Sequence, residues 1–294
     1  MSIDLHTHST ASDGTVPPAD LMAAAPAAGV SVIALTDHDS TGGWDEAATA
    51  LPPGLTLVPG AEISCRYPVP VAGGGTTRVA VHLLALLFDR AEPAFAAARE
   101  SLRVSRSSRG RRIVGRLQQA GYDVDWARVR ALAAGAPVGR PHLARALVEI
   151  GAVRDVPEAF VRLLESTGPY YEPKADLDAV HAIEMVRAAG GVPVLAHPFA
   201  RRRGPCVDRA AIAVMRDAGL LGIEVDHPDH DPTARADAAA IAGALGLIGT
   251  GSSDYHGTNK PTALGIETTA PAAYYRIVDA AGGVRPITAI ACRP

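Results

Sequence analysis

Histidines and carboxylates recur in this chain at places where apolar segments begin or end. Asp4, His6 and His8 alternate along a short segment near the start, and alternate residues of a strand share one face. Further donors stand in or directly after other apolar runs: Asp13, His38, Glu62, His82, His197, Glu224, Asp254 and His256. Neutral imidazole and ionised carboxylate together suit divalent transition metals. The pattern therefore predicts a metal site.

Each of these residues alone has a plainer explanation. A single histidine in an apolar strand, such as His82, is more often a hydrogen-bonded core residue, and a carboxylate at a strand end is often a cap or a surface group. The set is more specific than its members, because its residues fall at predicted strands and none falls in the middle of a predicted helix. The metal site is the better interpretation of the joint pattern.

The elements that must position these residues alternate between strands and helices. Short apolar runs predict strands at 2–7, 31–36, 55–58, 78–86, 192–196, 221–225 and 247–250, and helical spacing predicts helices at 176–189, 207–218 and 232–244. Pro and Gly over 68–77 indicate a loop or hairpin tip. Repeated strand–helix units predict an α/β fold with a parallel sheet, close to a barrel. In such a barrel the carboxyl ends of the strands meet at one mouth.

Composition and charge exclude several classes of protein. The chain has 294 residues, 48% of them hydrophobic, with 28 basic and 31 acidic residues, so neither bulk disorder nor bulk attraction to nucleic acid or to an anionic membrane is expected. Cys65, Cys206 and Cys292 have no spacing of a disulfide framework or of a cysteine-rich zinc site. No apolar stretch approaches the ~18 residues of a membrane span, and no leader is evident. We expect a cytoplasmic protein without an obligate protein partner.

Five motifs resemble those of the PHP (polymerase and histidinol phosphatase) phosphoesterase family and span residues 4–257. They are Asp4-Leu-His-Thr-His-Ser9, Thr36-Asp-His-Asp39, Gly60-Ala-Glu-Ile-Ser64, Ala196-His-Pro198 and Ser253-Asp-Tyr-His-Gly257. The resemblance implies a distorted (βα)7 barrel. Segments 1–91 and 166–294 would form the barrel, and 92–165, where no strand is predicted, would be a helical insertion that caps the substrate.

The same resemblance implies two or three divalent ions, with Mn, Zn and Fe left open. One ion would take His6, His8, Glu62 and Asp254; a second would share Glu62 and add His82 and His197; a third would take Asp13, His38 and His256. Such a site hydrolyses phosphoesters through a metal-bridging hydroxide, with Asp254 and His227 as candidates for proton transfer. Asp37, Asp39 and Glu224 are interpreted as partners of the ligands or as helix caps.

Two motifs bear on the substrate. Gly139-Arg-Pro-His142 is similar to a motif of the nucleoside 3′,5′-bisphosphate phosphatase and 5′–3′ exoribonuclease branch, which implies that Arg140, at a predicted helix start, binds the phosphate that does not react. His227-Pro-Asp-His230 is likewise similar to a motif of that branch, so His227 is a candidate contact to the substrate phosphate. His230 is expected at the surface. His142 and His181 are not assigned to metal.

Basic residues gather in two further places. Seven arginines lie in 99–116 at spacings that favour a helical stripe, which is usually a solvated face but could follow an RNA backbone. Arg201-Arg-Arg203 follows the His197 motif directly, so Arg201 is the better candidate for contacts to a longer substrate. Tyr170 and Tyr171 are the aromatic side chains considered for base stacking.

The sequence thus predicts a metal-dependent phosphoesterase that removes the 3′-phosphate of nucleoside 3′,5′-bisphosphates, with short 5′-phosphorylated oligoribonucleotides as longer substrates. One alternative is a phosphatase of a small metabolite such as histidinol phosphate, which needs only one phosphate pocket. Another is a non-catalytic, metal-stabilised binding domain, which the complete set of expected ligands argues against.

Overall fold

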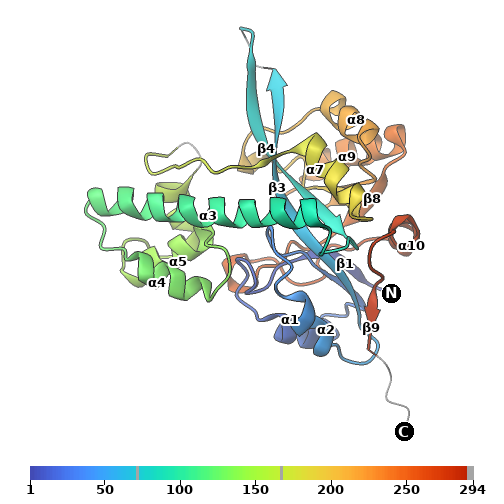
Figure 1. The fold of residues 1–294 in the computed structure, drawn as a ribbon, viewed down its shortest axis with the longest axis horizontal. Coiled ribbons are helices and arrows are strands. Elements are labelled where there is room, and N and C mark those ends of the chain that lie inside the picture. Colours follow the sequence, from blue (N-terminus) through green and yellow to red (C-terminus); the bar gives the residue numbers. More distant parts are fainter. Residues whose placement is uncertain (71–72, 166–167, 290–294) are drawn as a thin grey trace.

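The strands form a nearly closed barrel (Figure 1). The computed structural model describes residues 1–70, 73–165 and 168–289. The strands that follow one another around the barrel are β1 (Ile3–Thr7), β2 (Val32–Leu35), β3 (Thr56–Pro70), β4 (Thr76–Leu86), β6 (Val192–Ala196), β7 (Gly222–Asp226) and β8 (Ile248–Gly251). Two short strands, β5 (Leu177–Asp178) and β9 (Ile287–Thr288), pair with β3. The predicted barrel of seven strands is confirmed.

The sheet is not parallel throughout, which corrects the sequence-based expectation. β4 runs antiparallel to both β3 and β6, whereas the other neighbours on the path are parallel. β3 and β4 form a long hairpin that projects away from the barrel in Figure 1. The sequence predicts that Glu62 ends the third strand, but Glu62 lies in the middle of β3. His82 lies in the middle of β4. The hairpin continues past the barrel mouth because the first cluster of turn residues comes only after Val69.

A register shift in β1 separates residues that strict alternation would have placed together. Asp4 pairs with Ile33 and Thr7 pairs with Leu35, so three residues of β1 match two residues of β2. Asp4 and Thr7 therefore share a face, and His6 lies on the opposite one. His6 and His8 still point the same way, as predicted, but Asp4 leaves their group.

The three helices predicted at 176–189, 207–218 and 232–244 are present, with small changes at their ends, as α7 (Ala179–Ala188), α8 (Arg209–Asp217) and α9 (Pro232–Leu245). The structure also has the helices α1 (Pro18–Ala24), α2 (Trp44–Thr49) and α10 (Pro271–Ala280) beside the strands. Asp178, Asp208 and Asp231 each accept a hydrogen bond from a backbone N–H in the first turn of the helix that follows. The predicted helix at 176 thus starts later, because 177–178 form β5 and Asp178 is the N-cap.

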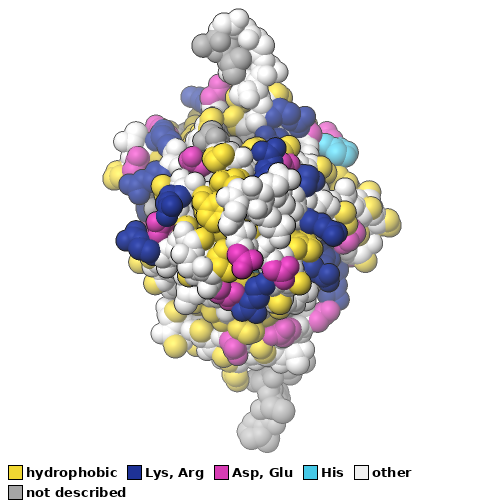
Figure 2. Space-filling model, turned by 90° about the vertical axis from the view of Figure 1, so that its left-hand side faces the viewer, with side chains coloured by type: hydrophobic (Ala, Val, Ile, Leu, Met, Phe, Trp, Pro, Cys, Tyr) yellow, Lys and Arg dark blue, Asp and Glu magenta, His cyan; other side chains and the backbone are white. Residues whose placement is uncertain are grey.

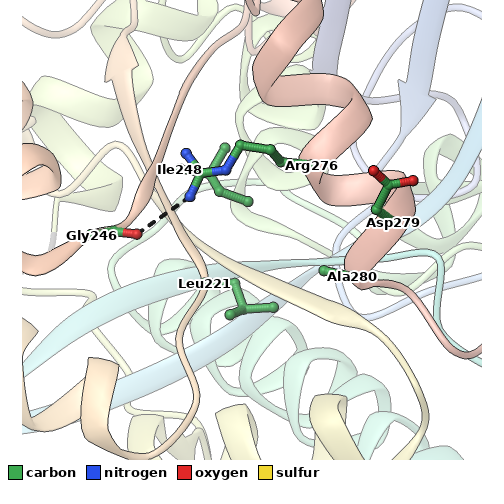
Figure 3. A pocket seen from close by; sticks show the side chains of 6 residues that line it. All are labelled: Leu221, Gly246, Ile248, Arg276, Asp279 and Ala280. Atoms are coloured by element: carbon green, nitrogen blue, oxygen red, sulfur yellow. Dashed lines mark hydrogen bonds between the residues drawn. The ribbon is translucent and has the colours of Figure 1, made fainter.

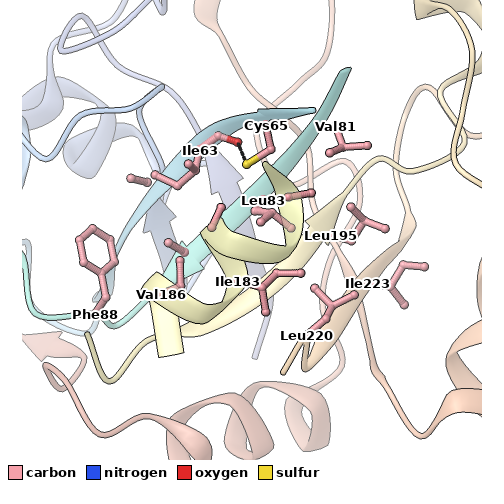
Figure 4. Packing of buried hydrophobic residues seen from close by; sticks show 14 of the residues in the cluster. Ile63, Cys65, Val81, Leu83, Phe88, Ile183, Val186, Leu195, Leu220 and Ile223 are labelled. Atoms are coloured by element: carbon pink, nitrogen blue, oxygen red, sulfur yellow. Dashed lines mark hydrogen bonds between the residues drawn. The ribbon is translucent and has the colours of Figure 1, made fainter. Parts of the chain in front are cut away.

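Apolar side chains pack on both faces of the barrel wall. On the outer face, Leu83, Leu195 and Ile223 of the strands contact a cluster that includes Ile183 and Val186 of α7 (Figure 4). Inside, Ile3, Val58, Leu84, Val194 and Ile248 form a second cluster, which Tyr274 and Ile277 of α10 complete. Because apolar side chains fill the interior of the barrel, the polar donor residues lie at its mouth.

The described residues between β4 and β5 form several helices, joined by turns and irregular segments, and no strand. The elements are α3 (Pro93–Gln119), α4 (Trp126–Ala133), α5 (Arg140–Glu149), α6 (Val156–Ala159) and the short π-helix η1 (Phe160–Leu164). Ile113, Leu117, Val129, Leu143 and Leu147 belong to a core of their own. In Figure 1 the long helix α3 starts against the barrel and extends to α4 and α5. Within the described residues, none of the helices combines the length and apolarity that a bilayer crossing requires.

Candidate metal centre

Four donor atoms from three parts of the chain meet at the barrel mouth. His6 Nε2 lies 3.1 Å from His8 Nε2, 3.3 Å from Glu62 Oε2 and 3.5 Å from Asp254 Oδ1. His8 Nε2 lies 3.1 Å from the same Glu62 oxygen and 3.4 Å from the same Asp254 oxygen. Two ligands bound at about 2.1 Å to one tetrahedral ion are about 3.4 Å apart. The spacing of these atoms therefore fits a common metal ion.

Glu62 turns its second oxygen toward another pair of histidines. Its Oε1 lies 2.6 Å from His82 Nδ1 and 3.0 Å from His197 Nε2. His82 reaches Glu62 because β4 is the antiparallel neighbour of β3 and places Ser64 opposite His82. The carboxylate thus stands between two groups of imidazoles, where it can bridge two ions.

A third group lies on the other side of His8. Asp13 Oδ1 is 3.5 Å from His256 Nε2 and 3.8 Å from His8 Nδ1, and Asp13 Oδ2 is 3.7 Å from His38 Nε2. These four side chains offer donor atoms that all lie within 4.8 Å of one another. All nine residues predicted from the sequence as metal ligands are thus gathered at the mouth.

His227 joins the donors more closely than predicted. Its Nε2 lies 3.3 Å from Asp254 Oδ2, and it forms a group of possible ligands with His6 and Asp254. Its Nδ1 accepts a hydrogen bond from the backbone N–H of Asp229, so the neutral ring carries its proton on Nε2. His230, expected at the surface, is only 3% exposed. Its two ring nitrogens bond to the backbone of Val225 and Phe199, which makes it a structural residue.

The electrostatics of the mouth favour bound cations. Burial opposes the charge on His6 and His8, yet the carboxylates around them raise the pKa of His6 well above its ordinary value and that of His8 to about 9. Burial likewise opposes the charge on Glu62 and Asp254, yet neighbouring cationic groups hold the pKa of both carboxyls well below the usual range. Buried carboxylates at this density require positive charge, which divalent ions supply with the donor set present here.

Three further carboxylates hold the donors and their loops in place. Glu224 accepts from His6 Nδ1 at 3.0 Å and from the backbone N–H of His197 at 2.7 Å. Asp37 accepts from the backbone and hydroxyl of Ser9, and Asp39 accepts from the backbone and hydroxyl of Ser64. The sequence left two roles open for these carboxylates, partners of the ligands or helix caps. The observed hydrogen bonds are those of partners that hold the ligands and their loops.

Backbone strain is concentrated in the same region. Asp39, His197 and Asp254 have φ values of 55°, 29° and 50°, a left-handed conformation that is rare for residues with a side chain. Such strain persists where surrounding contacts enforce it, and it is common at functional sites. The hydrogen bonds of Asp39 and Glu224 are among those contacts.

Lys260 is a charged group at the site that no sequence motif indicated. Its Nζ donates to Asp254 Oδ2 at 2.6 Å, and the side chain is partly exposed. It reaches the mouth from the short 3₁₀ turn η3 (Gly257–Asn259), which follows the last donor motif. Only its position shortly after His256 could have suggested it.

The two arginines predicted to contact substrate, Arg140 and Arg201, lie in different surroundings. Arg140 is the first residue of α5, where its Nη1 donates to the backbone oxygen of Leu164 at 2.9 Å and its guanidinium lies over the ring of Phe160. A Cβ at the preceding Gly139 would be 3.7 Å from Asp13 Oδ2, so α5 begins beside the donors. Arg201 instead donates to Asp237 at 2.9 Å on the surface, apart from the donor groups.

The arginines of α3 do not form a single solvated stripe, which corrects that interpretation. Arg99, Arg106 and Arg109 are buried, and Arg112 and Arg116 pair with Glu172. On the face of the molecule turned toward the viewer in Figure 2, basic side chains are interspersed with acidic ones. The aromatic pair considered for stacking is engaged as well: Tyr170 contacts Tyr122, and the Tyr171 hydroxyl accepts from Arg66. His142 caps α5, and His181 is exposed on α7.

A cavity of about 370 Å³ lies at the other end of the barrel (Figure 3). Leu221 and Ile248, which line it, stand at the amino ends of β7 and β8, and Arg276 and Asp279 of α10 close it. The donor residues follow the carboxyl ends of the same strands. This cavity is therefore not part of the candidate metal centre.

Comparisons with known proteins agree with this geometry. A family model described as the PHP domain matches residues 4–99. The chain is 35% identical to a 5′-3′ exoribonuclease of Haemophilus influenzae, over 86% of this chain and 89% of the relative. It is also 35% identical to a 3′,5′-nucleoside bisphosphate phosphatase of Chromobacterium violaceum, over 87% of each. A solved structure from Bifidobacterium adolescentis, described as a metal-dependent phosphoesterase, superposes with a TM-score of 0.87 at 33% identity and covers 96% of both chains.

Proposed function

We propose that this chain, which belongs to the PHP-domain family of metal-dependent phosphoesterases, removes the 3′-phosphate from nucleoside 3′,5′-bisphosphates. Short 5′-phosphorylated RNAs would be longer substrates of the same site. The observation that carries the proposal is the position of Arg140, a partly buried cation at the start of the helix that begins beside Asp13. A metal centre with a second anion site next to it suits a substrate with two phosphates.

The donor groups at the mouth fit two or three divalent ions. One would be held by His6, His8, Glu62 and Asp254, a second by Glu62, His82 and His197, and a third by Asp13, His38 and His256. Ions bound there supply Lewis acidity toward the phosphoryl oxygens and an activated water as nucleophile. Manganese, zinc and iron all suit this mixture of imidazole and carboxylate.

Protein groups beside the metal-binding residues would transfer a proton to the leaving oxygen. His227 holds its proton on Nε2, which points toward Asp254 at 3.3 Å. Cleavage at the 3′-phosphate leaves an alkoxide that needs a proton, and His227 is the candidate to deliver it. Asp254, whose pKa is held well below the usual range, would be ionised and is the candidate to accept a proton. Lys260, already within hydrogen-bond distance of Asp254, adds positive charge where negative charge develops.

Arg140 would bind the 5′-phosphate. The helix start and the guanidinium both favour an anion at this position. Burial lowers the pKa of Arg140, and a phosphate brought there would offset that cost of burial. A substrate with a single phosphate would leave this cation without a partner.

The test compares phosphate release, in the presence of Mn²⁺, from adenosine 3′,5′-bisphosphate, AMP and histidinol phosphate. The wild type should prefer the bisphosphate, Arg140→Ala should lose that preference, and Arg145→Ala, on the same helix, should keep it. Equal release from the monoesters, unaffected by Arg140→Ala, would favour the small-metabolite phosphatase. No release from any of the three by the metal-loaded protein would favour the non-catalytic binding domain and would refute the proposal.

A further inference from the structure

The turn that follows β1 brings a serine back to the ring of His8. The backbone N–H groups of Ser12 and Gly14 both donate to the carbonyl oxygen of Ser9, at 3.1 and 3.0 Å. Gly14 allows this close return, since a Cβ there would lie 2.6 Å from the backbone oxygen of His8. Ser12 is 2% exposed, and its Oγ lies 3.4 Å from His8 Nδ1. The hydroxyl therefore faces the ring nitrogen of His8 that is turned away from Glu62.

The hydroxyl of Ser12 has one proton, and the distances indicate which group receives it. Ser12 Oγ lies 2.6 Å from Asp37 Oδ1 but 3.4 Å from Asp13 Oδ1. The shorter distance is typical of a hydroxyl that donates to a carboxylate. With its proton on Asp37, the oxygen of Ser12 can only accept a hydrogen bond from His8. His8 therefore carries a proton on Nδ1, and its Nε2 can bind an ion.

Asp37 is fixed in a position that holds this hydroxyl. It is 1% exposed and also accepts from the backbone N–H and the hydroxyl of Ser9, at 2.9 and 2.7 Å. Asp37 follows β2, which pairs with β1, so the contact joins the ends of two neighbouring strands. A carboxylate held by three donors keeps Ser12 in one orientation.

The neighbouring donor His6 is held in a comparable way, but directly by a carboxylate. Its Nδ1 donates to Glu224 at 3.0 Å, while its Nε2 joins the donor atoms at the mouth. A hydrogen bond of this kind orients an imidazole that binds metal and raises its basicity. For His8, Asp13 Oδ1 is 3.8 Å from Nδ1, which is too far for a hydrogen bond. Ser12 instead links His8 to a carboxylate.

We infer that Ser12 is a positioning residue of the metal centre, which connects His8 to the carboxylate of Asp37 and orients the ring so that Nε2 faces the ion. The inference rests on the metal site of the proposed function and gives Ser12 no contact with substrate. Because Ser12 receives the Nδ1 proton, the carboxylate of Asp13 stays available to the third group of donors.

The experiment measures the affinity of the full-length protein for Zn²⁺ by competition with a chromophoric chelator. Ser12→Ala removes the link. Ser9→Ala is the matched control, because the hydroxyl of Ser9 bonds to the same carboxylate at 2.7 Å and, among the described residues, contacts no donor histidine. Ser12→Ala should weaken binding of the ion about ten- to a hundredfold, and Ser9→Ala should stay close to the wild type. Wild-type affinity in Ser12→Ala, or an equal loss in both variants, would overturn the inference.

Nuclear magnetic resonance of the zinc-loaded protein, labelled with ¹⁵N at histidine, adds a readout that a merely structural role would not move. In the wild type, His8 should show a protonated Nδ1 and a metal-bound Nε2, and the Nδ1 proton should exchange with water faster in Ser12→Ala. Ser12→Thr keeps the hydroxyl and should preserve both the signal and the affinity. If Ser12→Ala does not fold, Ser12→Cys replaces it, since a thiol is a weaker acceptor. A wild-type His8 without a proton on Nδ1 would refute the inference.

The inference and the proposed function can fail separately. If no bisphosphate is hydrolysed but zinc affinity still depends on Ser12, the proposed function fails and the role of Ser12 stands. If the bisphosphate is hydrolysed and Ser12→Ala binds zinc like the wild type, the function stands and the role of Ser12 is wrong.

Discussion

The ion pair between Arg106 and Asp39 should contribute measurably to stability. Both Nε and Nη2 of Arg106 donate to Asp39 Oδ2, at 3.1 and 2.9 Å, and both residues are buried. The pair joins the helical segment to the barrel next to the donor His38. Replacing Arg106 with methionine keeps most of the volume of the side chain but leaves the Asp39 carboxylate buried without its cation.

Two estimates give a similar magnitude. Removing one partner of a buried pair costs about 3–5 kcal/mol. Burial opposes the charge on Asp39, but Arg106 and other cations lower its pKa from 3.8 to about 2. At about 1.36 kcal/mol per unit, that shift corresponds to roughly 2.5 kcal/mol. A loss of about 3 kcal/mol should lower the melting temperature by about 5–10 °C in a chain of this size.

The pH dependence of this contribution has a definite sign. The pKa of Asp39 is lower in the folded than in the unfolded protein, so the stabilisation is fully present above pH 3.8 and is lost as the pH falls through about 2. The difference in stability between the wild type and Arg106→Met should therefore be full at pH 7 and should shrink below pH 3.8.

The assay is urea and thermal unfolding of the wild type, Arg106→Met, Asp39→Asn and the double variant, with Arg111→Met as the control. The double-mutant cycle should give a coupling energy of about 2–3 kcal/mol, since each single change removes the same interaction. If Arg106→Met melts within 1 °C of the wild type, or if the two changes are additive, the pair does not hold the helical segment to the barrel.

Three further outcomes concern the metal centre. Glu62→Gln should lose at least half of the bound metal, measured by mass spectrometry, because this carboxylate faces two groups of imidazoles; full occupancy would contradict its bridging position. Gly14→Ala should lower metal content and melting temperature, since the new Cβ would lie 2.6 Å from the backbone oxygen of His8; an unchanged protein would mean that this loop yields freely. Chelation should lower the melting temperature, because Glu62 and Asp254 lose the cations that offset their charge. If the free ion is present at about 100 times its dissociation constant, its removal lowers the free energy of unfolding by ~2.7 kcal/mol per site. Identical melting with and without chelator would argue against resident ions.

Local sequence was sufficient for much of the barrel and its donors. The strand at 192–196 has the predicted limits, because a short apolar run between a glycine pair and a histidine leaves little alternative. His6 and His8 were identified as partners from their spacing alone, and their Nε2 atoms are 3.1 Å apart. Both features depend on neighbours within a few residues, which the sequence displays directly.

Residues whose roles depend on distant elements could not be assigned in this way. Glu62 is expected from the sequence at the carboxyl end of a parallel strand, yet it lies within an antiparallel hairpin, where it meets His82. The sequence places His82 inside a strand but does not show that this strand is antiparallel, since the pairing depends on the full length of both strands. His230 was expected at the surface but is enclosed by the loop at Phe199, which lies 31 residues away in the chain.

The arginines of α3 show the same limit most clearly. Their spacing defines a helix face but does not indicate what covers that face. Arg106 meets Asp39, 67 residues away, whereas Arg109, one turn further along, meets no carboxylate in the described structure. The sequence alone determined the donor set and most of the barrel strands, because these follow from local periodicity. Only the tertiary structure decided which cations are buried and which are paired with a carboxylate, because burial and pairing are set by packing between elements far apart in the chain.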